Sequence, residues 1–172
     1  MARLDELDPL LQSLQALKPP GASKTKITSI TTLCVENIQV RSANSRLFVY
    51  ALLTFAQSDS IIAQKLFTHF KKTTATHKLG VLFVIDSVTR QWIERARQTG
   101  QELSGSSAPS GTFASGIYRI TELMTSLIDD LLRVAPEEQK VCTIAIRKPR
   151  AGSGPGPGSG PGPGPAQSQR SA

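Results

Sequence analysis

Apolar residues recur at intervals of three and four along most of this chain, and that spacing places them on one face of an α-helix. The two clearest stripes are Leu4, Leu7, Leu11 and Leu14 near the start, and Phe113, Ile117, Ile120, Met124, Leu127 and Leu131 further on. The first stripe stops at Lys-Pro-Pro-Gly, residues 18–21, and the second stops before Pro136. Because proline cannot continue a helix, both stripes predict helices with defined ends.

Two further helices are predicted between these. Ser23 is a suitable N-cap for a helix with Ile27, Ile30, Cys34 and Ile38 on its apolar face. A shorter helix is indicated by Ile62, Leu66, Phe67 and Phe70. Since the supported elements are helices, we predict an all-α fold in which short loops join antiparallel neighbours.

The segment HKLGVLFVIDSVTRQW, residues 77–92, is almost continuously apolar. By periodicity alone, residues 79–88 fit a buried strand as well as a buried helix. We favour a helix over 77–97 because the run continues without a breaker, and because only 48–56 offers a possible partner strand. Asp86 in its middle needs an explanation, since a buried carboxylate is costly unless it is paired or functional.

The net charge of +7 does not by itself identify a partner. Four of the basic residues stand in a C-terminal stretch that has no acidic residue, namely Arg147, Lys148, Arg150 and Arg170. Charge alone favours a solvated surface as the explanation of the excess of basic residues, rather than binding of a phosphorylated or nucleic-acid partner. Cys34 and Cys142 show no paired spacing and the N-terminus has no signal-like pattern, so we expect a reducing compartment and a soluble protein.

Motifs that would indicate catalysis are absent from the sequence. No glycine-rich phosphate loop opens a helix, and no nucleophile has a base at a recognisable spacing. His69 and His77 lie eight residues apart without further ligand candidates, so we interpret them as solvated or capping residues. We therefore predict a non-enzymatic chain with no cofactor and no metal.

Two polar constellations remain as candidates for binding. Asp86 and Arg90 are four residues apart on one helix face, where the simplest interpretation is an intrahelical ion pair. A basic cluster collects at the N-terminus of the second helix and in the loop before it: Lys18, Ser23, Lys24 and Lys26. Free backbone N–H groups and the helix dipole favour an anion there, although a solvated basic loop is the simpler explanation of the cluster. Together the two constellations suit a phosphopeptide, which needs a phosphate seat and a polar anchor.

Three long segments resemble the CTD-interacting domain of fungal Nrd/Seb-type transcription termination factors. They are LQSLQALKPPGASKTKI, QKLFTHFKKTTATHKLGVLFVIDSVTRQW and SGTFASGIYRITELMTSLIDDLLRVAPEEQK, and the match covers residues 4–39 and 58–140. The resemblance implies a right-handed superhelix of antiparallel helices, eight in the family. It also implies a ligand, the phosphorylated heptad-repeat tail of RNA polymerase II, Tyr-Ser-Pro-Thr-Ser-Pro-Ser.

The resemblance assigns roles around the unexplained aspartate. It implies that Asp86 accepts a hydrogen bond at the β-turn of the ligand, near the heptad tyrosine, and that Arg90 lies near the phosphates or backbone of the tail. Phe83 and Ser87 would lie beside Asp86, and Ile27 would form the floor of the groove. Where this chain has Phe83 the family often has tyrosine, so a hydroxyl contact from that position is lost.

The resemblance also assigns the basic cluster. Ser23 and Lys24 match the loop that seats the phosphoserine of the fifth heptad position, with Lys18 and Lys26 close by. A short extended ligand held in this way must be ordered on binding, and its phosphate contacts are screened by salt. We therefore expect weak, salt-sensitive binding.

Two stretches depart from the family pattern. Residues 40–57, VRSANSRLFVYALLTFAQ, interrupt the match with eighteen aromatic and apolar residues, whose codons permit splice-site sequences at both ends. We interpret 40–57 as a retained intron, with a genuine lineage-specific insertion as the alternative. Residues 141–172 stand where the family has its last two helices, and their Gly-Pro repeats predict a disordered tail, which a gene-model error would also produce.

These observations predict a helical domain over residues 1–140 that binds the phosphorylated polymerase tail in the nucleus, as a monomer, and couples transcription to termination and RNA 3′-end processing. RNA would be bound only through a downstream domain that this sequence does not contain, and no membrane contact is expected. The alternative is a helical adaptor of the ENTH/VHS type, which shares the architecture but binds lipid or sorting signals. Its basic amphipathic first helix is not evident, because Asp5, Glu6 and Asp8 stand there.

Overall fold

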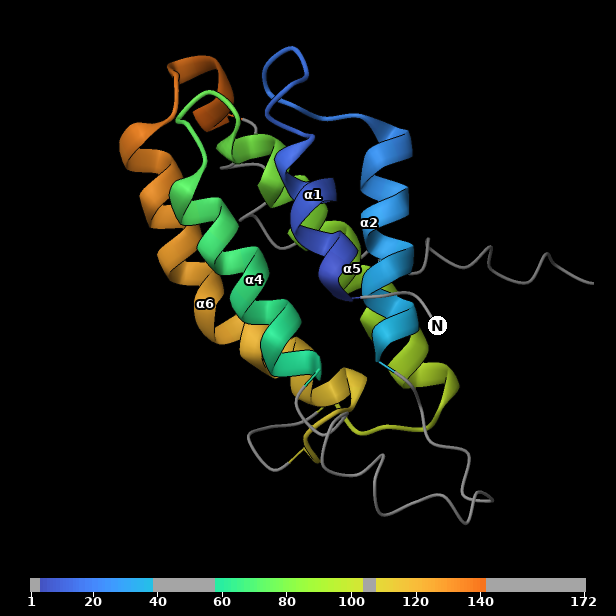
Figure 1. Cartoon of the computed structure of the whole chain (residues 1–172). Helices are drawn as coiled ribbons and strands as arrows, with labels where there is room; N and C mark the ends of the chain where they lie inside the picture. The colour runs from blue at the N-terminus through green and yellow to red at the C-terminus, as the bar shows by residue number, and fades with distance from the viewer. Residues whose placement is uncertain (1–3, 39–57, 104–107, 142–172) are drawn as a thin grey trace, which may run out of the picture.

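The computed structural model describes residues 4–38, 58–103 and 108–141, and within these ranges all regular structure is helical (Figure 1). A short 3₁₀ turn at Leu4–Glu6 leads into the helices α1 (Leu7–Gln12), α2 (Lys24–Asn37), α4 (Ser58–Lys72), α5 (Lys78–Gln98) and α6 (Phe113–Val134), and residues 137–141 form a further helical turn. The predicted all-α class is confirmed.

The helices α1 and α2, α4 and α5, and α5 and α6 follow one another along the chain and run in opposite directions, as predicted (Figure 1). Helix α5 is central, because it packs against α2, α4 and α6. Helices α2 and α5 run in the same direction, so their N-terminal ends lie at the same end of the molecule, next to the loop between α1 and α2. That shared end positions the candidate site.

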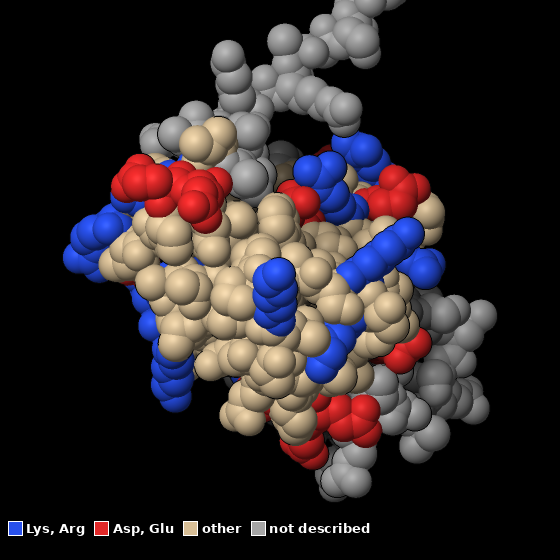
Figure 2. Space-filling view, turned by 90° about the horizontal axis from the view of Figure 1, so that it is seen from above, with Lys and Arg blue, Asp and Glu red and all other residues tan. Residues whose placement is uncertain are grey.

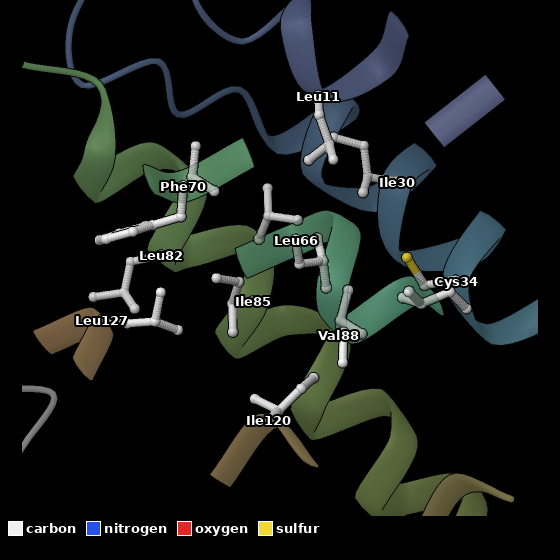
Figure 3. Packing of buried hydrophobic residues seen from close by; sticks show 14 of the residues in the cluster. Leu11, Ile30, Cys34, Leu66, Phe70, Leu82, Ile85, Val88, Ile120 and Leu127 are labelled. Carbon is white, nitrogen blue, oxygen red and sulfur yellow. The ribbon is translucent and has the colours of Figure 1, made fainter. Parts of the chain in front are cut away.

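The core is one apolar cluster to which α1, α2, α4, α5 and α6 all contribute (Figure 3). Its centre is the face of α5 that carries Leu82, Ile85 and Val88, all of which are at most 1% exposed. Side chains from the surrounding helices that meet this face include Leu11 of α1, Ile30 of α2, Phe70 of α4 and Leu127 of α6. Burial of this apolar surface is the main force that holds the helices together.

The first helix is shorter than its leucine spacing predicts. Helix α1 ends at Gln12, and beyond it amide groups bond to carbonyls three residues back: Leu14 to Leu11, Gln15 to Gln12 and Leu17 to Leu14. Such bonds form 3₁₀ turns, which have three residues per turn and therefore still direct Leu14 inward, where it is fully buried. The apolar spacing thus predicted the burial correctly and the helix end wrongly.

The helix predicted over 77–97 is confirmed as α5, residues 78–98, so the strand alternative for 79–88 is wrong. The premise that Asp86 is buried is also wrong. The aspartate lies on the outer face of α5 with its side chain 36% exposed, and it is bonded to Arg90. No burial cost therefore requires a special role for it.

A buried aspartate does occur elsewhere, at the start of α4. Asp59 is fully buried, and its Oδ1 accepts a hydrogen bond from the Gly111 amide at 2.9 Å. Its Oδ2 accepts from Ser115 Oγ at 2.7 Å and from Arg119 Nε at 3.0 Å. Asp59 therefore ties the first turn of α4 to the start of α6.

A second buried charge joins α5 to α6. Lys78 is 5% exposed, and its ammonium donates to Asp130 Oδ2 at 2.8 Å and to the Phe70 carbonyl at 2.9 Å. The same ammonium lies 4.5 Å from the centre of the Phe70 ring. The hydrogen bond from Lys78, with a further one from Arg133, lowers the pKa of the Asp130 carboxyl from 3.8 to about 2.

The expectations about residues 40–57 and about the tail after Val141 fall outside the described residues. Residues 137–141 are helical, at the point where the family sequence continues with its last two helices. Gln139 donates to the Thr76 carbonyl at 2.9 Å, which fixes this turn against the α4–α5 loop. Among the helices that the structure describes, none has the combined length and apolarity that a bilayer crossing requires.

Candidate peptide-binding site

The loop between α1 and α2 lies directly on the first turn of α5. A Cβ atom on Gly80 would stand 2.1 Å from the Pro20 carbonyl oxygen and 3.0 Å from the Gly21 carbonyl carbon. Gly21 itself has φ = 79°, a backbone conformation that glycine adopts without strain. Glycine at both positions therefore allows the loop that precedes Ser23 to contact α5.

His77, the residue just before α5, ties the same loop in place. Its Nε2 donates to the Leu17 carbonyl at 2.9 Å, so its Nδ1 accepts from the hydroxyls of Thr74 at 3.1 Å and Thr76 at 3.0 Å. His77 occupies the N-cap position, although its side chain makes no capping bond. The ring therefore links the α1–α2 loop to the α4–α5 loop and does not cap the helix.

The predicted phosphate seat is at the N-terminus of α2. Ser23 is the N-cap residue in extended conformation, and its hydroxyl accepts no capping hydrogen bond. Lys18 and Lys24 are exposed at this end, while Lys26 is half-buried and donates from Nζ to the Ser13 carbonyl at 3.2 Å. Figure 2, seen towards this end of the molecule, shows separate Lys and Arg side chains on a largely uncharged surface. Two of the three predicted lysines are thus exposed, and Lys26 is engaged with the end of the first helical segment.

The predicted polar anchor lies further along α5. Arg90 Nε donates to Asp86 Oδ2 at 2.8 Å, and this hydrogen bond raises the pKa of the Arg90 guanidinium. The arginine side chain is 71% exposed. From the described part of the chain, no donor reaches Asp86 Oδ1, so that oxygen can accept a hydrogen bond from a ligand.

Ser87 joins the anchor to α2. The Thr31 hydroxyl lies 2.9 Å from Ser87 Oγ and 2.7 Å from the Ile27 carbonyl. Ile27 and Phe83 are half-buried and pack against the core.

A cavity of about 300 Å³ lies between the two helices below this contact. We call it the α2–α5 cavity, and it is lined by Thr28, Thr31, Thr32, Val35, Glu36, Ser87, Gln91 and Arg95. Of the residues predicted from the sequence only Ser87 reaches it. The sequence shows that residues 87, 91 and 95 lie on one face of α5, because they are four residues apart. It does not show that this face packs against α2.

The structure thus places the predicted residues on one pair of helices and the loop before them. Sequence reasoning missed Gly80 and the role of His77, which together hold this arrangement. A glycine inside an apolar helix and a histidine just before it were the signals available. Larger cavities lie between α1 and α4, about 560 Å³, and between α4 and α6, about 580 Å³, and neither contains a predicted site residue.

The α1–α4 cavity contains the other histidine. Burial lowers the pKa of His69, which is half-buried and not solvated as predicted. Nearby, Lys65 forms an ion pair with Asp8 between the two helices. Across the ranges 4–38, 58–103 and 108–141, no group of three His, Cys, Asp or Glu side chains is arranged to hold a metal ion.

Comparison with known proteins gives consistent likenesses. No family model matches the chain. The Rpb7-binding protein seb1 of Schizosaccharomyces pombe is 29% identical over 149 residues, which cover 84% of this chain and 21% of that protein. The chain therefore spans about a fifth of the length of this relative.

Solved structures with the same fold include the yeast Nrd1 CID in complex with Sen1 NIM3, with a TM-score of 0.66 and 22% identity over 84% of both chains. Another is the CTD-interacting domain of Seb1 from S. pombe, with a TM-score of 0.64 and 24% identity over 84% of this chain and 85% of that one. These likenesses confirm the helical superhelix expected from the sequence.

Proposed function

We propose that this chain, which has the fold of the CTD-interacting domains of Nrd- and Seb-type factors and is related in sequence to Seb1, binds the phosphorylated heptad-repeat tail of RNA polymerase II. The matched structures are interaction domains, and the proposed role is likewise binding without catalysis. The setting we propose is the nucleus, where such binding would couple transcription to termination and RNA 3′-end processing.

One observation carries the proposal: the phosphate seat and the polar anchor lie on adjacent, parallel helices that start at the same end of the molecule. Gly80 is level with the loop before Ser23, and Asp86 follows six residues later on α5. At 1.5 Å per helical residue, the anchor is roughly 9 Å along α5 from the level of the seat. The tyrosine and the phosphoserine at the fifth position of one heptad are four residues apart and span at most roughly 14 Å when extended, so they can cover this distance with a turn between them.

The proposed contacts are chemically complementary. Lys18, Lys24 and the first N–H groups of α2 supply positive potential for the phosphate. Asp86 Oδ1 would accept a hydrogen bond from the turn of the peptide while Oδ2 keeps its bond to Arg90. Phe83 supplies apolar surface without the hydroxyl that tyrosine would bring.

The test is fluorescence anisotropy with a labelled two-repeat peptide, either phosphorylated at the fifth heptad position or unphosphorylated. Asp86→Asn keeps the size of the side chain but removes the charge, and we expect about tenfold weaker binding of the phosphopeptide, as for loss of one charge-assisted hydrogen bond. Asp129→Asn, an exposed aspartate on α6, is the matched control and should leave the affinity unchanged.

The phosphate seat is tested separately with Lys24→Gln. We expect weaker binding of the phosphopeptide, no change for the unphosphorylated peptide, and a smaller salt dependence of the affinity. Equal affinity of the wild-type chain for both peptides would contradict the assignment of the seat.

A helical adaptor that binds lipid remains the second candidate, because it shares the architecture. The acidic residues Asp5 and Glu6 in the first turns disfavour contact with an anionic membrane. Co-sedimentation with vesicles that contain anionic lipid would support the adaptor if binding followed the lipid charge. A nucleic-acid function driven by the basic tail would instead disappear on deletion of residues 147–172, whereas peptide binding would persist.

A further inference from the structure

The α2–α5 cavity continues the proposed peptide site away from the phosphate seat. Ser87 belongs to both, since it lies beside Asp86 on α5 and also lines the cavity with Thr31 and Arg95. A peptide that follows the seam between the two parallel helices therefore passes the anchor and reaches this cavity.

The cavity lining suits a phosphoryl group. Hydroxyl and amide donors surround it, and Arg95 is exposed and forms no ion pair with another residue in the described part of the chain. The Thr31 hydroxyl has a single hydrogen, which it gives either to the Ile27 carbonyl or to Ser87 Oγ. When it goes to Ser87, the Ser87 hydrogen can turn to a ligand. Glu36 is the one acidic residue of the lining, and it would oppose an anion.

The distance from the phosphate seat to Arg95 matches the repeat of the proposed ligand. Arg95 follows Gly80 by fifteen residues on α5, which corresponds to roughly 22 Å along the helix axis. With one β-turn, whose first and last Cα atoms lie within about 7 Å, and four extended steps, seven residues still span up to roughly 21 Å, and the long Arg95 side chain reaches towards the peptide. Two phosphates one heptad apart would therefore reach both positions.

We propose that the α2–α5 cavity is a second phosphate subsite, in which Arg95 reads a phosphoserine one heptad away from the one held at Ser23 and Lys24. The inference rests on the proposed function and specifies its ligand: a tail segment that carries two phosphates at the same position of consecutive repeats. Arg95 then acts as a specificity residue, because it contributes only when the second phosphate is present.

The test uses three two-repeat peptides measured by anisotropy: one with a single phosphate at a fifth position, one with both fifth positions phosphorylated, and one with two phosphates three residues apart. We expect the wild-type chain to bind the second peptide about five- to tenfold more tightly than the other two. Arg95→Gln should remove this gain and leave the affinity for the single phosphate unchanged. Arg97→Gln, an exposed arginine on the same helix that does not line the cavity, is the matched control and should keep the gain.

A further variant tests the electrostatic argument. Glu36→Gln removes the opposing charge, and we expect it to strengthen binding of the one-heptad double phosphopeptide about twofold to threefold without affecting the single phosphopeptide.

Equal affinity of the wild-type chain for all three peptides would overturn the second subsite while leaving the proposed function intact. So would an Arg95→Gln variant that weakens every peptide equally. Absence of binding to any phosphopeptide would overturn the proposed function itself.

Discussion

Replacing Gly80 by alanine tests whether the contact between α5 and the α1–α2 loop holds the phosphate seat in place. The new Cβ would stand 2.1 Å from the Pro20 carbonyl oxygen, whereas real Cβ contacts are essentially never shorter than 3.0 Å. The loop and the helix must therefore separate by roughly 1 Å. The atom met is backbone, so rotation of a flexible side chain cannot relieve the clash.

Two opposing contributions determine how much Gly80→Ala changes the free energy of unfolding. Overpacking of this kind costs about 1–3 kcal/mol, while glycine to alanine inside a helix contributes up to about 1 kcal/mol in favour of the variant. We expect Gly80→Ala to lower the free energy of unfolding by about 1–2 kcal/mol. Because the displaced loop leads directly to Ser23, phosphopeptide affinity should fall several-fold.

The assay combines urea unfolding with phosphopeptide titration under conditions where the variant remains folded. Gly116→Ala is the matched control, because its Cβ would stand 2.5 Å from the Trp92 ring in the core. It should lower stability but leave the affinity of the folded protein unchanged. If Gly80→Ala matched the wild-type chain in both measurements, the close contact would be refuted. If Gly80→Ala lost stability but bound the phosphopeptide with wild-type affinity, the position of the α1–α2 loop would not determine binding at the phosphate seat.

Three further results are expected. Asp59→Ala leaves the Gly111 amide and two side chains without their buried acceptor, so urea unfolding should show a loss of about 3 kcal/mol, whereas exposed Asp129→Ala should change stability by less than about 0.5 kcal/mol. The pKa of Asp130 in the folded protein lies below its ordinary value, so its ionised form stabilises the fold by at most about 2 kcal/mol. This stabilisation is present above about pH 4 and is lost as the pH falls towards 2. In Asp130→Asn the free energy of unfolding should therefore change less with pH between about 4 and 2. Burial raises the pKa of the Cys34 thiol to about 12. In a Cys142→Ser background, a thiol reagent should therefore react with Cys34 only as fast as the protein unfolds. Fast reaction of the native protein would contradict the burial.

The helical class and most of the core follow from periodicity alone, because burial of an apolar stripe is a local property of the sequence. Leu14 and Leu131 are examples, since their spacing predicted the burial that the structure has. The end of the first helix could not be predicted in this way, because α-helical and 3₁₀ turns direct Leu14 inward alike. The choice between helix and strand for residues 79–88 likewise depended on what could pack against the segment.

The candidate site was predicted in its residues but not in its geometry. Lys18 and Lys24 are exposed as a phosphate seat requires, whereas the bond of Lys26 to the Ser13 carbonyl joins two segments and has no local signal. Attention to Asp86 as a buried carboxylate was misplaced, because the apolar run around it conceals which helix face is covered. The carboxylate that is buried, Asp59, stands at a helix start where an exposed acid is ordinary, and its partners lie more than fifty residues away.

The central claim is that a phosphorylated heptad peptide binds along α2 and α5. It is tested most directly by titrating the ¹⁵N-labelled chain with the phosphopeptide and following backbone amide shifts by NMR. We predict that the largest changes cluster at residues 23–27 and 83–95 and that they are absent with the unphosphorylated peptide at the same concentration. Changes centred instead on the α1–α4 or α4–α6 cavity would contradict the claim.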